Sequence, residues 1–266
     1  MPVETNTDMS IKSELVTVVI PIFNEEDGIT QLKEKLQHLQ NLLEQDFEVE
    51  LVFVDDGSRD RTVERLREQF VSHPAVSIVE HGINQGVGAA FRSGFAKARG
   101  SFVCTIDADC SYSPEGLLAL LHALQATGKD IAVASPYHPE GGVEGVPMWR
   151  LALSRACSAL YRQLSPLKLY TYTSIFRAYR AAVIQSVTFK ADGFVSASEI
   201  LIAAGRQGFT VTEVPMVLRS RTVGKSKMKV LRTIVSHLEM LSGFVVPARS
   251  SKEHRAAQMM EISQEK

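Results

Sequence analysis

Two carboxylates, Asp107 and Asp109, follow the apolar run that ends at Ile106 and are separated by one alanine. Carboxylates at this spacing can both reach one divalent cation if the backbone turns between them, and Mg²⁺ and Mn²⁺ prefer oxygen ligands. Mg²⁺ commonly uses one or two protein carboxylates together with substrate phosphates. The alternative is an aspartate pair that hydrogen-bonds within its own turn. The pair alone leaves both interpretations open.

Two further polar turns follow apolar runs in the same way. Asn24 and Glu25 come after the first run, and Asp55 and Asp56 come after the second, in the segment VDDGSRD. Asp-Gly-Ser is a common turn sequence, so a turn without a ligand is one interpretation. A carboxylate at a strand end can also accept hydrogen bonds from a ribose or a base edge, as in dinucleotide-binding folds.

The elements that would position these acids alternate between strand and helix. Apolar and β-branched runs predict strands at 15–20, 47–54, 75–79, 101–106 and 130–135. Helical spacing predicts helices between them, at 29–43, 60–70, 84–100 and 114–125. Asn24 is expected to cap the first of these helices, with acids in its first turn. This order predicts an α/β fold with a doubly wound, mostly parallel sheet.

In such a sheet, ligands bind beyond the carboxyl ends of the strands, and all three acidic turns fall there. Like charges brought together cost stability unless a cation or a ligand offsets them. We therefore interpret Asp107 and Asp109 as ligands of Mg²⁺ or Mn²⁺.

The pattern changes after about residue 140. A glycine-containing loop precedes a predicted helix at 149–161, whose apolar residues Trp149, Leu153, Cys157 and Leu160 share one face. Helical, extended and helical patterns then follow at 196–207, 209–218 and 229–244.

Two segments could meet a ligand through backbone or charge. The glycines of NQGVGAAFRSG, residues 84–94, indicate close backbone approach, either to a ligand or between elements. This segment has neither a Walker sequence nor the dinucleotide-binding spacing. Residues 219–232 hold six bases and no acid. Such a run is usually a solvated face, but it could be a loop that closes on a diphosphate or a contact with anionic lipid.

The composition predicts a globular protein without a nucleic-acid partner. The chain of 266 residues has 30 acids and 29 bases, so no global charge favours nucleic acid. Its three cysteines lack paired spacing, and Cys104 is expected in the core. The polar N-terminus, and the absence of an apolar run near ~20 residues, predict a cytoplasmic protein that is soluble or peripheral at the inner face of the membrane.

Read in order, seven segments resemble the family 2 glycosyltransferases of the GT-A fold, and most of all the dolichol- and polyprenyl-phosphate sugar synthases. The segments are VVIPIFNEE, VFVDDGSRDRT, NQGVGAAFRSGFAKARG, IDADCSYSPE, FRAYR, GFTVTEVP and RTVGKSK. The resemblance implies one GT-A domain at 14–245. Within it, 14–135 would bind the nucleotide sugar and 136–245 the acceptor, while 1–13 and 249–266 would be polar, disordered tails.

On the donor side, the resemblance implies that Asp107 and Asp109 hold the metal that bridges the donor diphosphate. Arg221 and Lys227 would engage the same diphosphate. The remaining residues implied at the nucleotide sugar are Pro21, Phe23, Glu25, Val54, Asp56 and Ala108.

On the acceptor side, Arg150 and Ser154 match an Arg-x-x-x-Ser pattern that holds the acceptor phosphate in the synthase branch. Glu199 matches an acid near the acceptor, and it would be the catalytic base if the acceptor were a sugar hydroxyl. The implied reaction is metal-dependent, inverting transfer from a GDP- or UDP-linked sugar to a polyprenyl phosphate. A membrane-anchoring partner or peripheral contact would give access to such an acceptor.

Three departures from the synthase pattern leave the acceptor less specified than the donor. Pro136, in SPY, stands where the synthases often carry arginine, and Ser111 stands where some carry glutamine. YTYTSIFR differs from the usual DLTGSFR. The alternatives are transfer to a sugar hydroxyl in polysaccharide or glycolipid synthesis, a non-catalytic nucleotide-binding subunit, and a nucleotidyltransferase. The last should carry a basic, glycine-rich loop where this chain has PIFNEEDG.

Overall fold

The computed structural model describes residues 14–70, 74–220 and 230–245. The chain divides into two compact units, Met1–Lys227 and Met228–Lys266. The second unit contributes one described helix, α8 (Val230–Val245), on which Val235 and Leu238 are exposed. The expected boundaries of a single domain at 14–245 stay a prediction.

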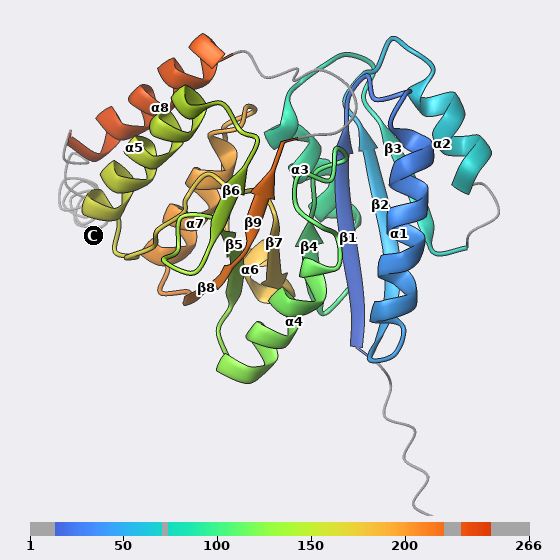
Figure 1. Ribbon diagram of the computed structural model, residues 1–266, viewed down its shortest axis with the longest axis horizontal. Coiled ribbons are helices and arrows are strands. Elements are labelled where there is room, and N and C mark those ends of the chain that lie inside the picture. Colours follow the sequence, from blue (N-terminus) through green and yellow to red (C-terminus); the bar gives the residue numbers. More distant parts are fainter. Residues whose placement is uncertain (1–13, 71–73, 221–229, 246–266) are drawn as a thin grey trace, which may run out of the picture. The chain divides into compact units, whose positions relative to one another are not determined.

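In the described part of the first unit, seven strands form one sheet in the order β3-β2-β1-β4-β7-β5-β8 (Figure 1). These strands are β1 (Glu14–Ile22), β2 (Phe47–Asp55), β3 (Val76–Glu80), β4 (Phe102–Thr105), β5 (Ile131–Ser135), β7 (Arg177–Arg180) and β8 (Val211–Pro215). β7 runs antiparallel to its neighbours β4 and β5, and the other neighbouring pairs are parallel. The predicted mostly parallel sheet is confirmed. β6 (Gly142–Glu144) and β9 (Val217–Arg219) pair separately.

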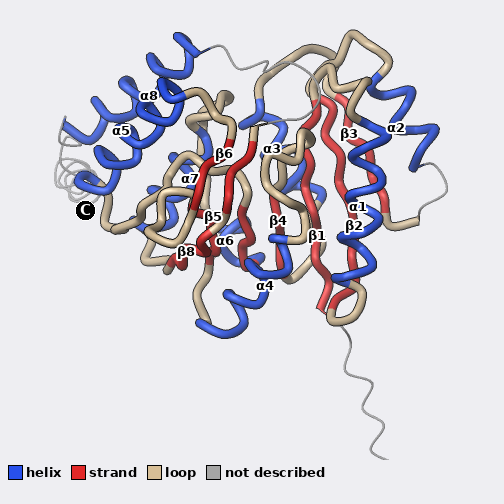
Figure 2. The backbone as a smooth tube through the Cα atoms, in the orientation of Figure 1, coloured by secondary structure: helices blue, strands red, loops and turns tan. Residues whose placement is uncertain are grey.

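Helices cover both faces of this sheet. They are α1 (Ile29–Leu43), α2 (Thr62–Phe70), α3 (Val87–Lys97), α4 (Gly116–Thr127), α5 (Met148–Leu164), α6 (Ala181–Ser186) and α7 (Ser196–Arg206). Figure 2 shows α1 and α4 in front of the red strands and α3 and α7 behind them. The alternation of strand and helix therefore builds the doubly wound arrangement that the sequence predicts.

The core follows from the alternation of side chains along β1. Val18 and Ile20 join one buried cluster with the leucines of α1 and α4. Val19 points to the opposite face, where a Cβ atom added at Gly94 of α3 would lie 2.3 Å from Val19 Cγ1. Gly94 thus lets α3 approach β1 closely. Both packed faces hold β1 rigid up to the turn that follows it.

Two local expectations are wrong. Asn24 does not cap α1, which begins at Ile29 after Gly28 and has no acid in its first turn. Asn24 instead accepts a hydrogen bond from Arg59 N at 2.8 Å, so its side chain ties two loops together. The helix expected at 84–100 ends earlier, at Lys97.

The apolar side chains predicted to share one face of α5 differ in burial. Trp149 and Leu160 are 54% and 44% exposed, whereas Cys157 is buried. Tyr161 and Ser158 lie on the buried side of α5, and both contact Tyr172. The ring centroids of Tyr161 and Tyr172 are 5.6 Å apart, and Ser158 Oγ accepts a hydrogen bond from Tyr172 N. An apolar face of α5 therefore reaches the surface.

Candidate active site

The candidate site lies where the strand order reverses. β1 pairs in parallel with β2 on one side and with β4 on the other. The sheet is therefore extended first on one side of β1, by β2 and β3, and then on its other side, from β4 onwards. Such a switch point leaves a crevice beyond the carboxyl ends of the strands. The turns after β1, β2 and β4 share this edge, which confirms that the three acidic turns lie together.

Strained backbone marks both sides of this switch. Among the described residues, the non-glycine residues with positive φ are Asn24 at 52° and Cys110 at 50°, which follow β1 and β4. This conformation costs about 1–2 kcal/mol in an L-residue. Hydrogen bonds hold both turns: Asn24 N donates to Ser58 Oγ at 2.8 Å, and Cys110 N donates to Asp107 O at 3.1 Å.

Ser111 fixes the orientation of the Asp109 carboxylate. Asp109 Oδ1 accepts from Ser111 N at 2.9 Å and from Ser111 Oγ at 2.6 Å. Ser111 O in turn accepts from Arg219 N at 2.9 Å, which ties the turn to the end of β9. The Asp-x-Ser spacing is itself a signal for such a turn. The turn interpretation of the pair thus holds in part, because Ser111 donates two hydrogen bonds to Asp109 Oδ1 and restricts the orientation of this carboxylate.

The donor set suits a hard cation that takes its other ligands from a substrate. Asp107 and Asp109 are half-buried in the turn that follows β4. Among the described residues, no three histidine, cysteine, aspartate or glutamate side chains cluster as a metal site. Burial raises the pKa of the adjacent Cys110 thiol to about 12, so it is no thiolate ligand at neutral pH. Two carboxylates fit Mg²⁺ or Mn²⁺ completed by phosphate oxygens and water.

Asp56 holds together the turns that follow β2 and β3. Its Oδ1 lies 2.9 Å from both His81 Nδ1 and Gln85 N, and its Oδ2 accepts from Asn84 Nδ2 at 2.8 Å and Gly86 N at 2.7 Å. Four partners fill the acceptor sites of a carboxylate. Asp56 is also buried. It therefore positions the turn that begins α3, and its contact with a nucleoside stays a prediction.

Sequence reasoning missed the second layer behind Asp56. His81 Nε2 lies 2.9 Å from Ser93 Oγ on α3, so His81 bridges β3's exit turn to that helix. Gly86 and Gly88 serve the same junction. A Cβ at either would lie within 2.3 Å of a backbone oxygen of residues 191–192, and Gly88 N donates to Asp192 O at 2.7 Å. The glycines of this segment permit approach between elements.

The other residues expected at the nucleoside divide by exposure. Pro21, Phe23 and Glu25 are half-buried at the end of β1, where a ligand could touch them. Ala108, between the two aspartates, is half-buried as well. Val54 is fully buried, with its Cγ2 turned towards Gly94 of α3, so it supports the site from below.

The residues expected at the acceptor phosphate lie one turn apart on α5. Ser154 Oγ lies 2.7 Å from Thr173 Oγ1, and the hydroxyl of Tyr137 also hydrogen-bonds to Ser154. Arg150 Nε is buried and has no hydrogen-bond partner in the described part of the chain. The pattern did not reveal Tyr137 or Thr173, which come from different segments.

The remaining predicted site residues are Glu199, Arg221 and Lys227. Both Glu199 oxygens accept from Lys190 N, at 3.1 and 3.2 Å, and Oε2 also accepts from Ala191 N at 2.8 Å. The carboxylate therefore caps the loop that contacts α3's start. Arg221 and Lys227 lie outside the described residues.

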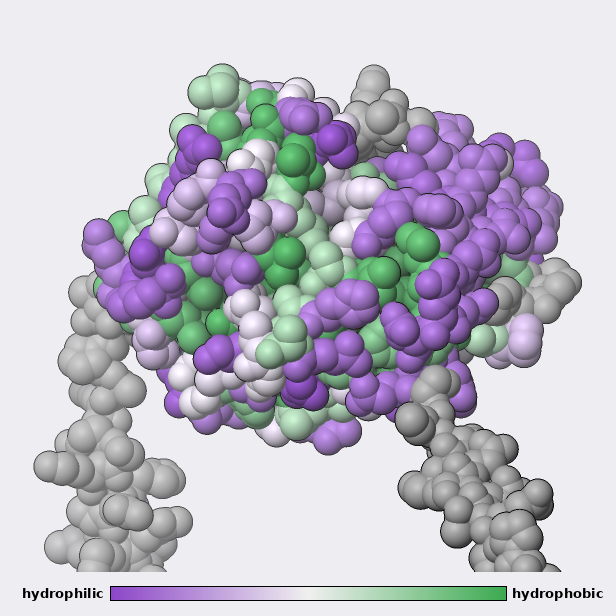
Figure 3. Space-filling model, turned by 60° about the horizontal axis from the view of Figure 1, so that its bottom comes forward, coloured by the Kyte–Doolittle hydropathy of each residue, from purple (hydrophilic) through white to green (hydrophobic). Residues whose placement is uncertain are grey.

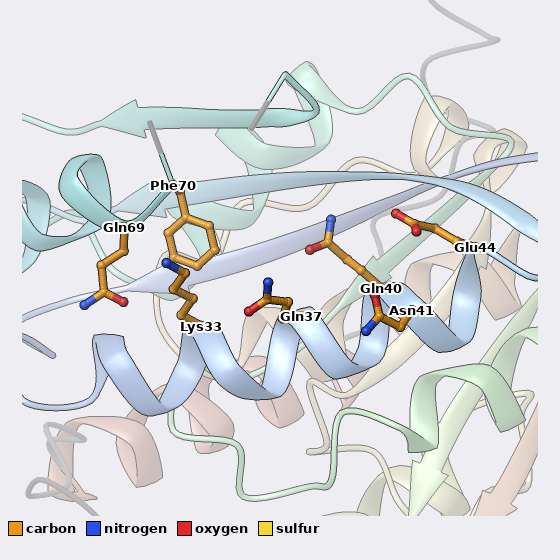
Figure 4. A pocket seen from close by; sticks show the side chains of 7 residues that line it. All are labelled: Lys33, Gln37, Gln40, Asn41, Glu44, Gln69 and Phe70. Atoms are coloured by element: carbon orange, nitrogen blue, oxygen red, sulfur yellow. The ribbon is translucent and has the colours of Figure 1, made fainter. Parts of the chain in front are cut away.

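A separate hollow of about 340 Å³ runs along α1 (Figure 4). It is lined by residues of α1 and the end of α2: Lys33, Gln37, Gln40, Asn41, Glu44, Gln69 and Phe70. None of these belongs to the turns that follow the strands. Figure 3 shows the surface at the right of that view to be mostly hydrophilic. The hollow therefore adds nothing to the candidate site.

The fold is an α/β fold whose acidic turns gather at one edge of a mostly parallel sheet, and comparisons with known proteins show its family. The model of Glycosyl transferase family 2 matches residues 17–188. The polyprenol monophosphomannose synthase of Mycolicibacterium smegmatis is 33% identical over 79% of this chain and 80% of its own. The dolichol-phosphate mannosyltransferase of Pyrococcus furiosus is 34% identical over 80% of this chain, which spans only 59% of that relative.

Solved structures show the same fold at low identity. Glucosyl-3-phosphoglycerate synthase from Mycobacterium tuberculosis, with Mn²⁺, UDP and glucosyl-3-phosphoglycerate, gives a TM-score of 0.63 at 21% identity over 89% of this chain and 82% of that one. Its complex with Mg²⁺ and UDP gives 0.63 at 20% identity over 89% and 81%. The fold is GT-A. The chain belongs to glycosyltransferase family 2 and is a glycosyltransferase.

We expect Ser111→Ala to weaken cation binding while leaving the fold intact. Losing the hydroxyl removes one of the two Ser111 donors that orient Asp109 Oδ1, and losing such an orienting partner commonly lowers metal affinity about 10-fold. Titration calorimetry with Mn²⁺, in the presence of a nucleoside diphosphate, measures the change. Ser113→Ala is the matched control, because Ser113 Oγ bonds to Glu115 in the same turn. Equal Mn²⁺ affinity of Ser111→Ala and the unaltered protein would contradict the assigned role.

Proposed function

We propose that this chain transfers a sugar, with inversion, from a GDP- or UDP-linked donor to a polyprenyl phosphate in a metal-dependent reaction. The observation that carries the proposal is the 33% identity with a polyprenol monophosphomannose synthase over four fifths of both chains. Two groups of residues support it independently. Asp107 and Asp109 suit the donor diphosphate with its cation, and Arg150 and Ser154 of α5 suit an acceptor phosphate.

On the donor side, Asp107 and Asp109 would hold the cation against the diphosphate. When bound, Mg²⁺ or Mn²⁺ neutralises the charge that develops on the leaving diphosphate. Ser111 keeps Asp109 turned towards that position. Arg221 and Lys227 would add positive charge to the same leaving group. Glucosyl-3-phosphoglycerate synthase, which has the same fold, was crystallised with UDP and Mn²⁺ or Mg²⁺, and this supports the use of a divalent cation.

On the acceptor side, a phosphate oxygen would attack the anomeric carbon opposite the leaving diphosphate. The new bond joins carbon to phosphate oxygen, and the bond to the donor diphosphate breaks. A phosphomonoester has a second pKa of about 6, so it is already an anion at neutral pH and needs no general base. Glu199 is engaged by Lys190 N and Ala191 N, which favours this acceptor over a sugar hydroxyl.

The surface of α5 suits a lipid-borne acceptor. Met148 and Trp149, directly before Arg150, are 75% and 54% exposed, and Leu160 and Leu164 expose 44% and 42% further along the helix. Residues 145–191 contain no aspartate or glutamate, so the arginines of this helix have no acid beside them in sequence. Exposed apolar side chains beside arginines suit the interface of an anionic membrane. None of the described helices is long and apolar enough to cross a membrane.

We expect Asp109→Ala to fold normally and to lose at least about 100-fold in turnover, because a cation ligand at the leaving group is gone. Release of nucleoside diphosphate from labelled donors, with Mn²⁺ or with EDTA, measures the loss. Asp46→Ala is the control, since Asp46 precedes β2 at the opposite edge of the sheet. Undiminished cation-dependent turnover by Asp109→Ala would overturn the proposal. A folded wild type that binds donor but never turns over would favour a non-catalytic subunit.

We expect Trp149→Gln to weaken sedimentation with vesicles of anionic phospholipid several-fold, because the exposed ring anchors α5 at the interface. Ile83→Gln is the matched control, because Ile83 is 71% exposed but lies in the turn after β3. Equal loss in both variants would mean that any exposed apolar side chain has this effect. That result, or no loss in Trp149→Gln, would contradict the role of α5.

A further inference from the structure

Three hydroxyl groups from three segments meet on the inner side of α5. Ser154 Oγ lies 2.7 Å from Thr173 Oγ1, and Tyr137 hydrogen-bonds to Ser154 from the segment that leaves β5. Each hydroxyl carries one proton. The two bonds within the chain of hydroxyls use two of the three protons, so one O–H group remains to donate to another acceptor.

Two arginines of α5 lie next to these hydroxyl residues, one by helical spacing and one by a ring contact. Arg150 lies one helical turn before Ser154, so both residues face the same side of α5. Its buried Nε has no hydrogen-bond partner among the described residues. Arg155 is exposed, and its guanidinium carbon lies 5.3 Å from the centroid of the Tyr137 ring. Neither arginine takes part in the ion pairs found in the described part of the chain.

We propose that Arg155 and Tyr137 complete the acceptor site as binding residues, and that Arg155 supplies the second positive charge for a phosphomonoester group. This inference rests on the proposed function, since it names further residues of the same site. Arg150 would give the first charge, and the hydroxyl chain would donate to a phosphate oxygen. A phosphomonoester carries nearly two negative charges at neutral pH, which two guanidinium groups can balance through charge-assisted hydrogen bonds.

Position 136 contributes no charge to this site. Pro136 is buried, carries no charge and has no N–H group to donate. It leads directly into Tyr137, whose ring then supports the Arg155 guanidinium by stacking. Burial raises the pKa of Tyr137, so its hydroxyl keeps its proton at neutral pH and stays a donor.

The same helix offers a matched comparison. The Arg162 guanidinium carbon lies 4.6 Å from the centroid of the Tyr170 ring, so it forms the same kind of arginine–tyrosine pair. Arg162 is seven residues beyond Arg155, about 10 Å further along the helix axis. If stacking on a tyrosine were only a feature of this surface, replacing either arginine would have the same effect on phosphate binding.

The test compares Arg155→Gln, Arg155→Lys and Tyr137→Phe with Arg162→Gln in the full chain. Titration calorimetry measures the binding of farnesyl phosphate, 3-phosphoglycerate and inorganic phosphate, and separately of GDP and UDP. We expect Arg155→Gln to bind farnesyl phosphate about 10-fold more weakly and Tyr137→Phe about 3-fold more weakly. Arg155→Lys should recover part of the affinity. Arg162→Gln should bind as the unaltered protein does, and nucleotide affinity should not change in any variant.

Transfer kinetics then separate this inference from the proposed function. An increase in KM for farnesyl phosphate at unchanged kcat in Arg155→Gln supports the site. Unchanged binding and KM in that variant, or an equal loss in Arg162→Gln, overturns it even where the unaltered protein transfers sugar. Arg155-dependent binding of phosphomonoesters without any transfer would support the site and contradict the function.

The phosphate probes identify the source of the acceptor group. Tighter binding of farnesyl phosphate than of 3-phosphoglycerate supports a lipid headgroup, and the reverse supports a soluble phosphomonoester in the same site. Failure of the unaltered protein to bind any of the three phosphates overturns the inference.

Discussion

The position of β1 between β2 and β4 is the constraint on which the site depends. Because all three strands are parallel, their carboxyl ends lie at one edge of the sheet, and the turns that follow them lie next to one another. Left-handed backbone at Asn24 and Cys110 then turns the chain sharply on both sides of the crevice. The acids gathered there have like charge, which a cation and a diphosphate arriving together would offset.

The polar groups of the site divide into those that meet a ligand and those that hold others in place. Asp56 has four hydrogen-bond partners and Ser111 orients Asp109, so both act through their neighbours. Glu199 caps a loop in a similar way. On α5, by contrast, Arg150 and Arg155 have no carboxylate partner in the described structure. The contrast between the acidic turns after β1, β2 and β4 and the arginines of α5 is what the proposed cation-bound donor and anionic acceptor would require.

Local patterns predicted the elements of the fold because periodicity depends on neighbouring residues. The strands and helices of residues 14–135 appear in the expected order, and the two aspartates lie at the expected edge. The Asn24 cap was wrong because its true partner, Arg59 N, is 35 residues away. The apolar spacing of α5 did not indicate which side is buried, because Ser158 and Tyr161 pack inside with Tyr172 while Trp149 stays exposed. Only tertiary folding brings together Tyr137, Ser154 and Thr173, so local sequence spacing could not predict this cluster.

Transfer to a lipid phosphate is tested most directly by following labelled sugar into an organic phase. The unaltered protein is incubated with labelled GDP- and UDP-sugars and either a polyprenyl phosphate or the matching polyprenol, with Mn²⁺ or with EDTA. We expect organic-soluble label only with the phosphorylated lipid and only with the cation. Equal labelling of the polyprenol, or no organic-soluble label from a panel of GDP- and UDP-sugars, would contradict the phosphate acceptor.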